Sequence, residues 1–117
     1  MTDRELLELA AKAAGIEFSE IGGGARYAPQ PGIMQPYVPW NPLTDDGDAL
    51  RLAVQLRIDV RIDNTTTLCY ASNGLHQQAC EKHTDHADPY SDLWADPFRA
   101  TRRAIVRAAA EIGKGVA

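Results

Sequence analysis

Three residues with the chemistry of zinc ligands follow one another closely in the second half of the chain. Cys80, His83 and His86 have the spacing C-x2-H-x2-H, and thiolate and imidazole are common zinc ligands. Cys69 or His76, from a neighbouring strand, would supply a fourth ligand. The pattern lacks the two close ligand pairs of most structural zinc sites. It admits a zinc-stabilised or metal-dependent domain, and histidines exposed where a strand meets a polar loop are the alternative.

A run of glycines offers a second kind of chemistry, the binding of an anion. Gly22, Gly23 and Gly24, with Arg26 just after them, would present backbone N–H groups and a guanidinium to a phosphate. Neither nucleotide fingerprint, GxGxxG or GxxxxGK[ST], is present. The alternative is a flexible turn that leads into a proline-rich loop.

Aromatic residues gather in two segments that lack a regular apolar period, 22–43 and 83–95. Aromatic side chains on loops, with arginines nearby, can stack on bases or on other flat ligands. They also serve as ordinary loop anchors and interface residues. The predicted site for an anionic, nucleotide-like ligand comprises Gly22, Gly23, Gly24, Arg26, Tyr27, Trp40, Trp94 and Arg103.

Basic side chains recur at every fourth position near the C-terminus. Arg99, Arg103 and Arg107 fall on one stripe of a predicted helix, and Glu111 continues it. Such a row can bind phosphates or an acidic partner. The alternative is a solvated stripe in which Arg107 and Glu111 form a surface pair of little energetic value.

An acidic run in the middle of the chain suggests calcium at first sight. Asp45, Asp46 and Asp48 are close together, but a calcium loop needs a glutamate at its twelfth position. Counted from Asp46, that position is Arg57. We therefore expect the run to start a helix, with Thr44 or Asp45 as its cap and negative charge at its first turn.

Three segments with the apolar period of a helix must position these residues. The first, about 3–14, begins with a capping box formed by Thr2 and Glu5 and ends at Gly15. The second lies in WNPLTDDGDALRLAVQL (40–56), and the third starts with Asp96 as cap and Pro97 in its first turn. The second helix should bury Ala49, Leu52, Ala53 and Leu56, with Leu50 and Val54 widening the apolar face and Asp48, Arg51 and Gln55 on a polar strip. The third should bury Phe98, Thr101, Ile105, Ala108 and Ile112, and end at Gly113 or Gly115.

Alternation of apolar and polar residues indicates strands over 16–21, 58–62, 66–71 and 75–82. Asn73-Gly74 is a strong hairpin signal between the last two. The expected fold class is α+β, an antiparallel sheet of about four strands with helices packed on it.

Composition narrows the function classes. The 117 residues suit one domain, 1–117, and a net charge of −4 argues against general nucleic-acid binding. Five basic residues follow position 98 against one acidic residue, so a basic end on an acidic body favours self-association or anion binding. No apolar run reaches the roughly 18 residues that span a membrane, and the N-terminus is not signal-like. We expect a cytoplasmic protein whose two cysteines stay reduced.

Three segments resemble a family of small phage and prophage proteins, the phage ABA sandwich domain. They are the N-terminal helix, WNPLTDDGDALRLAVQL with the following DVRID, and DPFRATRRAIVRAAAEIG. The resemblance implies an α-β-α sandwich-like fold and a phage-encoded protein in the bacterial host cytoplasm. It carries no catalytic residues over. By analogy alone, small phage proteins of this sort sometimes counter bacterial defence by sequestering nucleotide signals.

The chain shows no catalytic signature, and a Cys–His nucleophile would need an orienting group that the sequence does not place. We therefore expect a non-enzymatic phage accessory protein that binds a small anionic ligand. The first alternative is a protein-interaction module that binds a host or phage protein. The second is a zinc-stabilised or metal-dependent domain, in which Cys80, His83 and His86 would bind the zinc ion.

Overall fold

The computed structural model describes residues 2–16, 26–27, 38–63, 66–71, 76–82 and 97–115. Within them the chain has the predicted α+β class, with three helices and a three-stranded antiparallel sheet. A short ribbon of two strands stands apart from that sheet. In chain order the elements are α1 (Asp3–Ala14), β1 (Arg26–Tyr27), β2 (Val38–Pro39), α2 (Asp46–Leu56), β3 (Asp59–Ile62), β4 (Thr66–Ala71), β5 (His76–Lys82) and α3 (Pro97–Lys114).

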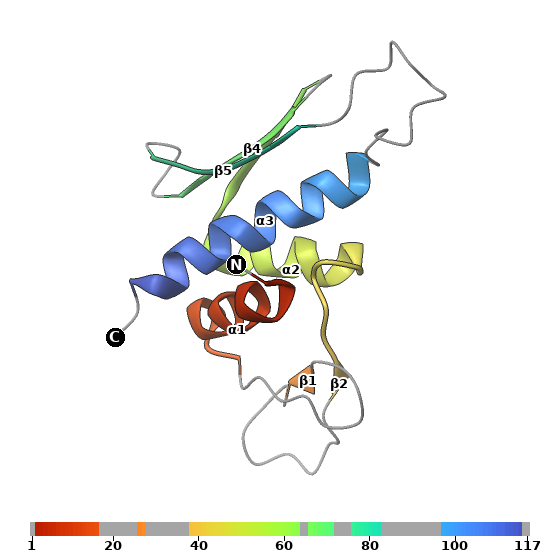
Figure 1. Cartoon of the computed structure of the whole chain (residues 1–117), viewed down its shortest axis with the longest axis vertical. Coiled ribbons are helices and arrows are strands. Elements are labelled where there is room, and N and C mark those ends of the chain that lie inside the picture. The colour runs from red at the N-terminus through yellow and green to blue at the C-terminus, as the bar shows by residue number, and fades with distance from the viewer. Residues whose placement is uncertain are drawn as a thin grey trace.

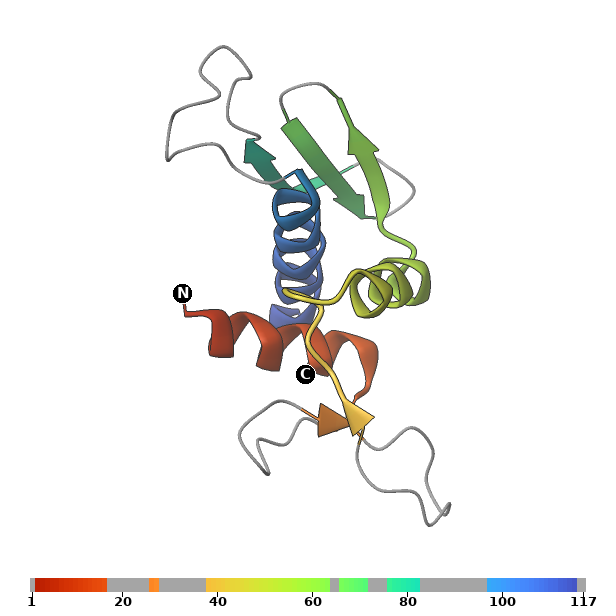
Figure 2. The same cartoon turned by 90° about the vertical axis from the view of Figure 1, so that its right-hand side faces the viewer.

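The long helix α3 is the element on which the others are assembled. It lies between the sheet and α1, with α2 beside it (Figures 1 and 2). It contacts α1, α2, β4 and β5. The three described helices therefore lie on the same side of the sheet, whereas the sandwich-like prediction placed helices on both faces.

The sheet has the order β3-β4-β5, and each neighbouring pair is antiparallel. Thr67 and Cys69 on β4 and Ala79 on β5 are buried, and α3 packs against these two strands. We predicted about four strands, and the described part of the sheet has three. The remaining predicted strand, 16–21, lies outside the described residues apart from Ile16, and so does Asn73-Gly74.

Helix α1 has the ends that its sequence predicts. The hydroxyl of Thr2 accepts from the Glu5 backbone N–H, and the Glu5 carboxylate accepts from the Thr2 N–H, which completes the capping box. Gly15 closes the helix in the left-handed region at φ 70°, where a glycine carries no steric cost. These local signals confirm the predicted bounds of 3–14.

Small residues let α1 and α3 approach closely. Ala10, Ala108 and Ala109 are fully buried, and a Cβ built on Gly113 would lie 2.0 Å from the Leu9 carbonyl oxygen. No side chain fits there without moving backbone. Gly113 is therefore part of the crossing between the helices. Of the two predicted helix ends, Gly113 and Gly115, the second is confirmed, because α3 continues to Lys114.

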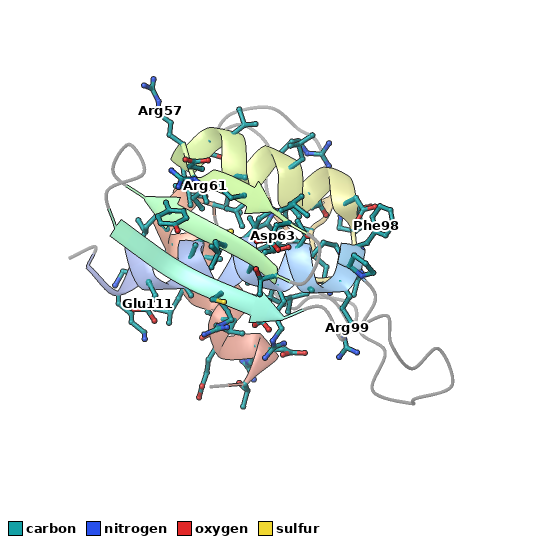
Figure 3. All side chains as sticks on the ribbon, turned by 90° about the horizontal axis from the view of Figure 1, so that it is seen from above. Arg57, Arg61, Asp63, Phe98, Arg99 and Glu111 are labelled. Atoms are coloured by element: carbon teal, nitrogen blue, oxygen red, sulfur yellow. The ribbon has the colours of Figure 1, made fainter. Side chains whose placement is uncertain are left out.

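Helix α2 begins as predicted at a capping aspartate. The Asp45 carboxylate accepts from the Asp48 backbone N–H at 2.8 Å. At the other end Arg57 adopts the left-handed conformation, with φ 56°. This turn leads directly into β3, so α2 and β3 lie side by side near one edge of the sheet (Figure 3).

The predicted buried faces of α2 and α3 are partly wrong. Leu50 and Val54, expected to widen the buried face of α2, are 64% and 68% exposed. Phe98, expected in the buried face of α3, is 66% exposed. Asp48, expected on a polar strip, is buried. The alanines of α3 explain why its buried face was predicted wrongly. Small residues let the neighbouring elements come close, so the alanine-rich face is buried although larger apolar residues lie elsewhere. The buried residues of α3 are mainly Ala100, Ala104, Ile105, Val106, Ala108, Ala109 and Ala110.

Candidate functional site

An apolar groove runs between α2, the edge strand β3 and the first turns of α3. Its volume is about 580 Å³. Its floor includes Ala49, Ala53 and Ile105, which are all buried. Val60 lies at its side. Three elements distant in sequence therefore build one concave apolar surface.

The rim of the groove is made of large apolar side chains that face water. Leu50 on α2, Ile62 on β3 and Phe98 on α3 line the groove and are 64%, 62% and 66% exposed. Val54 lies one turn from Leu50 on α2 and is also exposed. Contiguous exposed apolar surface of this kind marks binding sites more often than scattered single residues do.

One arginine fixes the distance between the two helices at the groove. The Arg102 side chain is 16% exposed. Its Nε donates to the Leu43 carbonyl oxygen at 2.9 Å, and its Nη1 donates to Asp46 Oδ1 at 2.7 Å. Both Arg102 and Asp46 line the groove, so the opposite charges within its wall are already paired with each other.

A second polar network holds the turn before α2. The buried Asp48 carboxylate accepts from the Asn41 backbone N–H at 3.0 Å and from Arg51 Nη2 at 2.7 Å. Burial of a carboxylate requires such partners. The network therefore fixes the α2 start, and with it the groove wall, in one position.

Of the predicted ligand-site residues, the described structure places the side chains of Trp40 and Arg103 only. Trp40 is 4% exposed and belongs to the apolar core. Of Arg26 and Tyr27 only the backbone, in β1, is described. The glycines 22–24 and Trp94 lie outside the described residues. The ligand site proposed from the sequence thus stays a prediction.

The arginine stripe of α3 is largely engaged in ion pairs with other elements. Arg103 pairs with Asp3 at 3.1 Å, and Arg107 Nη1 donates to Glu81 at 2.7 Å and to the Cys80 carbonyl oxygen at 3.0 Å. The predicted Arg107–Glu111 pair is replaced by Arg107–Glu81. Glu111 pairs with Lys114 instead. The stripe therefore joins α3 to β5 and α1.

The predicted zinc residues are described only in part. Cys80 is half-buried on β5, and His83 and His86 lie outside the described residues. Within the described ranges no group of three or more potential ligands comes together. Cys69 is fully buried. Burial raises the pKa of its thiol to about 12, and the negative charge of Asp59 also raises it, so the free Cys69 thiol stays protonated at neutral pH.

Sequence reasoning missed the groove because it assigned Leu50, Val54 and Phe98 to the core. A signal was present: apolar residues surround α2 on more than one face, which is more than one contact with a sheet can cover. The apolar surface of α2 that the sheet does not cover forms the α2 side of the rim.

The comparisons with known proteins add no family. No protein-family model matches the chain, and no curated protein or solved structure matches it. Among the described helices none is long and apolar enough to cross a membrane. The groove is thus the feature from which a function can be argued.

Proposed function

We propose that the chain is a protein-interaction module whose groove between α2, β3 and α3 binds an amphipathic segment of another protein. The observation that carries this proposal is the rim: Leu50, Ile62 and Phe98 are each more than 60% exposed around an apolar floor. Exposing three large apolar side chains to water has a cost that only contact with a partner recovers. The proposal corresponds to the first alternative of the sequence analysis, a protein-interaction module, with the groove as its candidate binding surface.

The shape of the groove favours a macromolecular partner over a small molecule. Small-molecule sites usually bury most of the ligand within a cavity. Here the rim residues remain largely open to water, so a ligand of drug size would stay half exposed. An amphipathic helix can lay an apolar face along such a groove and cover the rim at the same time.

The charges of the groove do not favour an anionic ligand. Arg102 is the basic residue in the lining, and it already holds Asp46 and the Leu43 carbonyl oxygen. Its other guanidinium N–H groups remain, but the Asp46 carboxylate offsets the Arg102 charge, so the groove lining offers a phosphate no net positive charge. The nucleotide-like ligand stays a prediction, which is based on the glycine run. The phage origin and the role against bacterial defence also stay predictions, which are based on the resemblance.

A displayed library of random 16-residue peptides, selected on the immobilised protein, tests the proposal. We expect the enriched peptides to carry apolar residues at i, i+3 or i+4, and i+7, the pattern of a helix with one apolar face. Phe98→Asp should weaken their binding at least about tenfold, because it places a charge in an apolar contact. Glu111→Ala, at the other end of α3 (Figure 3), is the matched control and should leave binding unchanged.

Two outcomes would overturn the proposal. One is enrichment of no peptide, or of peptides whose affinity Phe98→Asp does not alter. The other is a rise in melting temperature with linear or cyclic nucleotides, since a ligand that binds the folded state stabilises it. That result would favour the anionic-ligand hypothesis instead.

A further inference from the structure

We propose that two copies of this chain pair through the outer edge of β3, antiparallel and about a two-fold axis at Val60, to form one six-stranded sheet. The proposal concerns the backbone edge of β3 and does not depend on a partner in the groove. It rests on three observations: the direction of the edge backbone groups, the charge pattern of the strand, and the exposed apolar residues beside it.

The backbone groups of Val60 and Ile62 point away from the sheet. Asp63 donates its N–H to the Thr66 carbonyl oxygen at the β3–β4 turn, so residue 63 faces β4. Backbone groups alternate in direction along a strand, which places those of residues 59 and 61 toward β4 as well. Val60 and Ile62 therefore direct N–H and C=O groups to the outer edge. Among the described residues that edge has no strand partner, because β3 ends the order β3-β4-β5.

The sequence of the strand is complementary to itself when it is reversed. Residues 57–63 read RIDVRID. In an antiparallel pair centred on Val60, Asp59 lies opposite Arg61 of the partner subunit, and Arg61 lies opposite Asp59 of the partner subunit. Ile58 and Ile62 likewise lie opposite each other, and the two copies of Val60 exchange two backbone hydrogen bonds at the axis. Every cross-strand pair is then apolar with apolar or acid with base.

The neighbouring registers lack this complementarity. A pair centred on Arg61 places two arginines directly opposite each other and Asp59 opposite Asp63. A pair centred on Asp59 places two aspartates together. Like charges directly opposite destabilise a strand pair, so the charges disfavour both of these registers. A pair centred on Ile62 would set Arg61 opposite Asp63 but would leave Asp59 without an opposite charge, so the register centred on Val60 matches more charges. Within one copy Arg61 already pairs with Asp59 of the same strand at 3.1 Å, and both side chains stay exposed. The dimer would add the partner's opposite charges to this pair. Arg61 also lies over the Tyr70 ring, 4.2 Å from its centre, which holds the guanidinium on the sheet face where this pairing needs it.

The apolar side chains at this edge supply the contact area. Ile62 is 62% exposed on an edge strand, whereas edge strands that stay monomeric usually carry charges pointing inward or prolines at such positions. Leu50 and Val54, on the helix next to β3, are exposed as well (Figure 3). The two-fold axis brings α2 of both copies to the same side of the extended sheet, next to the junction.

Sedimentation equilibrium of the full chain and its charge variants tests the pairing. We expect a dimer whose dissociation constant rises at least about tenfold in Asp59→Arg and in Arg61→Asp, since each change converts both symmetric pairs into like charges. The double variant Asp59→Arg with Arg61→Asp restores both pairs and should return the dissociation constant to within about threefold of the original. Glu111→Arg, far from β3 on α3, changes the net charge as Asp59→Arg does and should have no effect.

A backbone variant separates the edge from the rest of the surface. Val60→Pro removes the N–H at the axis, which the β3–β4 ladder does not use, and should leave a monomer whose melting temperature confirms that it is folded. A monomer at all concentrations of the unaltered chain would overturn the proposal. So would a dimer that both single charge variants leave intact.

Discussion

The two ends of α3 differ in how closely they are packed. At the C-terminal end Gly113 and a set of alanines let α1 approach until no atom can be added. At the N-terminal end Phe98, a large aromatic residue, stands in water beside an open groove. Phe98 and Glu111 mark these two ends (Figure 3). The same helix is thus tightly packed at one end and lines an open apolar groove at the other.

The two ends of α3 should therefore respond differently to substitution. Close approach of small residues gains stability from dispersion contacts over the whole crossing. An aromatic residue that is two thirds exposed gains much less from burial in the isolated chain. Substitutions at the closed end should therefore alter the free energy of unfolding, and substitutions of the exposed rim residues at the open end should alter mainly binding.

Among the substitutions at the two ends of α3, a large effect is expected at Gly113. In Gly113→Ala the new Cβ meets the Leu9 carbonyl oxygen, so α1 and α3 must move apart along their whole contact. We expect a loss of about 3 kcal/mol in the free energy of unfolding, the upper part of the range for overpacking. Urea unfolding followed by circular dichroism measures it.

Gly115→Ala is the matched control for that variant. The nearest atom to its Cβ would be the Ile112 carbonyl oxygen at 3.5 Å, an ordinary contact, and Gly115 is exposed. Its free energy of unfolding should stay within about 0.5 kcal/mol of the original. Equal losses in the two variants would contradict the close crossing.

A smaller effect is expected at Arg102, which joins the open end of α3 to α2. Arg102→Met removes the hydrogen bonds to Leu43 and Asp46, and we expect a loss of about 1–2 kcal/mol in the free energy of unfolding. The estimate is modest because Asp46 is exposed and its ion pair is screened. Arg102→Lys should recover less than half, because one ammonium group lacks the fork that reaches both acceptors.

Arg99→Met is the control one turn earlier on the same helix. Arg99 is exposed, and its replacement should change the free energy of unfolding by less than about 0.5 kcal/mol. A loss as large as that of Arg102→Met would mean that net charge, and not the link to α2, determines the stability at this end.

Cys69 tests how well the sheet face under α3 excludes water. Its thiol pKa is raised from 9.0 to about 12 in the folded chain, so above pH 9 the unfolded chain loses a proton that the folded chain keeps. The stabilisation is present below the unfolded pKa and is lost as pH rises toward 12. Between pH 8 and pH 10 this group should lower the free energy of unfolding by about 1 kcal/mol.

The comparison of Cys69→Ala with Cys80→Ala isolates that contribution. Cys80 is half-buried on the neighbouring strand. Urea unfolding at both pH values should give a smaller pH dependence in Cys69→Ala only. The same dependence in both variants would show that water reaches the Cys69 thiol.

Local signals were enough to predict both ends of α1, the start of α2 and the β4 strand. A capping box, a glycine after α1 and a capping aspartate each act within four residues of one another, so the sequence contains both partners. The predicted strand 66–71 agrees with β4 for the same reason, because its alternation and its turn are local.

The buried faces and the groove depend on contacts between distant segments. Helical period shows that α3 has apolar residues but not which of its alanine-rich faces will meet α1. The pairing of Arg107 with Glu81 joins residues 26 positions apart, and the i, i+4 rule pointed to Glu111 instead. Exposure of Phe98 follows from the position of α2, which nothing near Phe98 in the sequence specifies.

The smallest stability effect is expected at Phe98. Phe98→Ser should lower the free energy of unfolding by less than about 1 kcal/mol, because about two thirds of the residue is already exposed. Ile105, two turns later on the same helix, is 5% exposed on the groove floor, and Ile105→Ala should cost about 2–4 kcal/mol although it removes fewer atoms. If Phe98→Ser proved as costly as Ile105→Ala, the ring would be part of the core and the rim would not be a binding surface. A near-neutral Phe98→Ser that loses the selected peptides would assign the open end of α3 to binding alone.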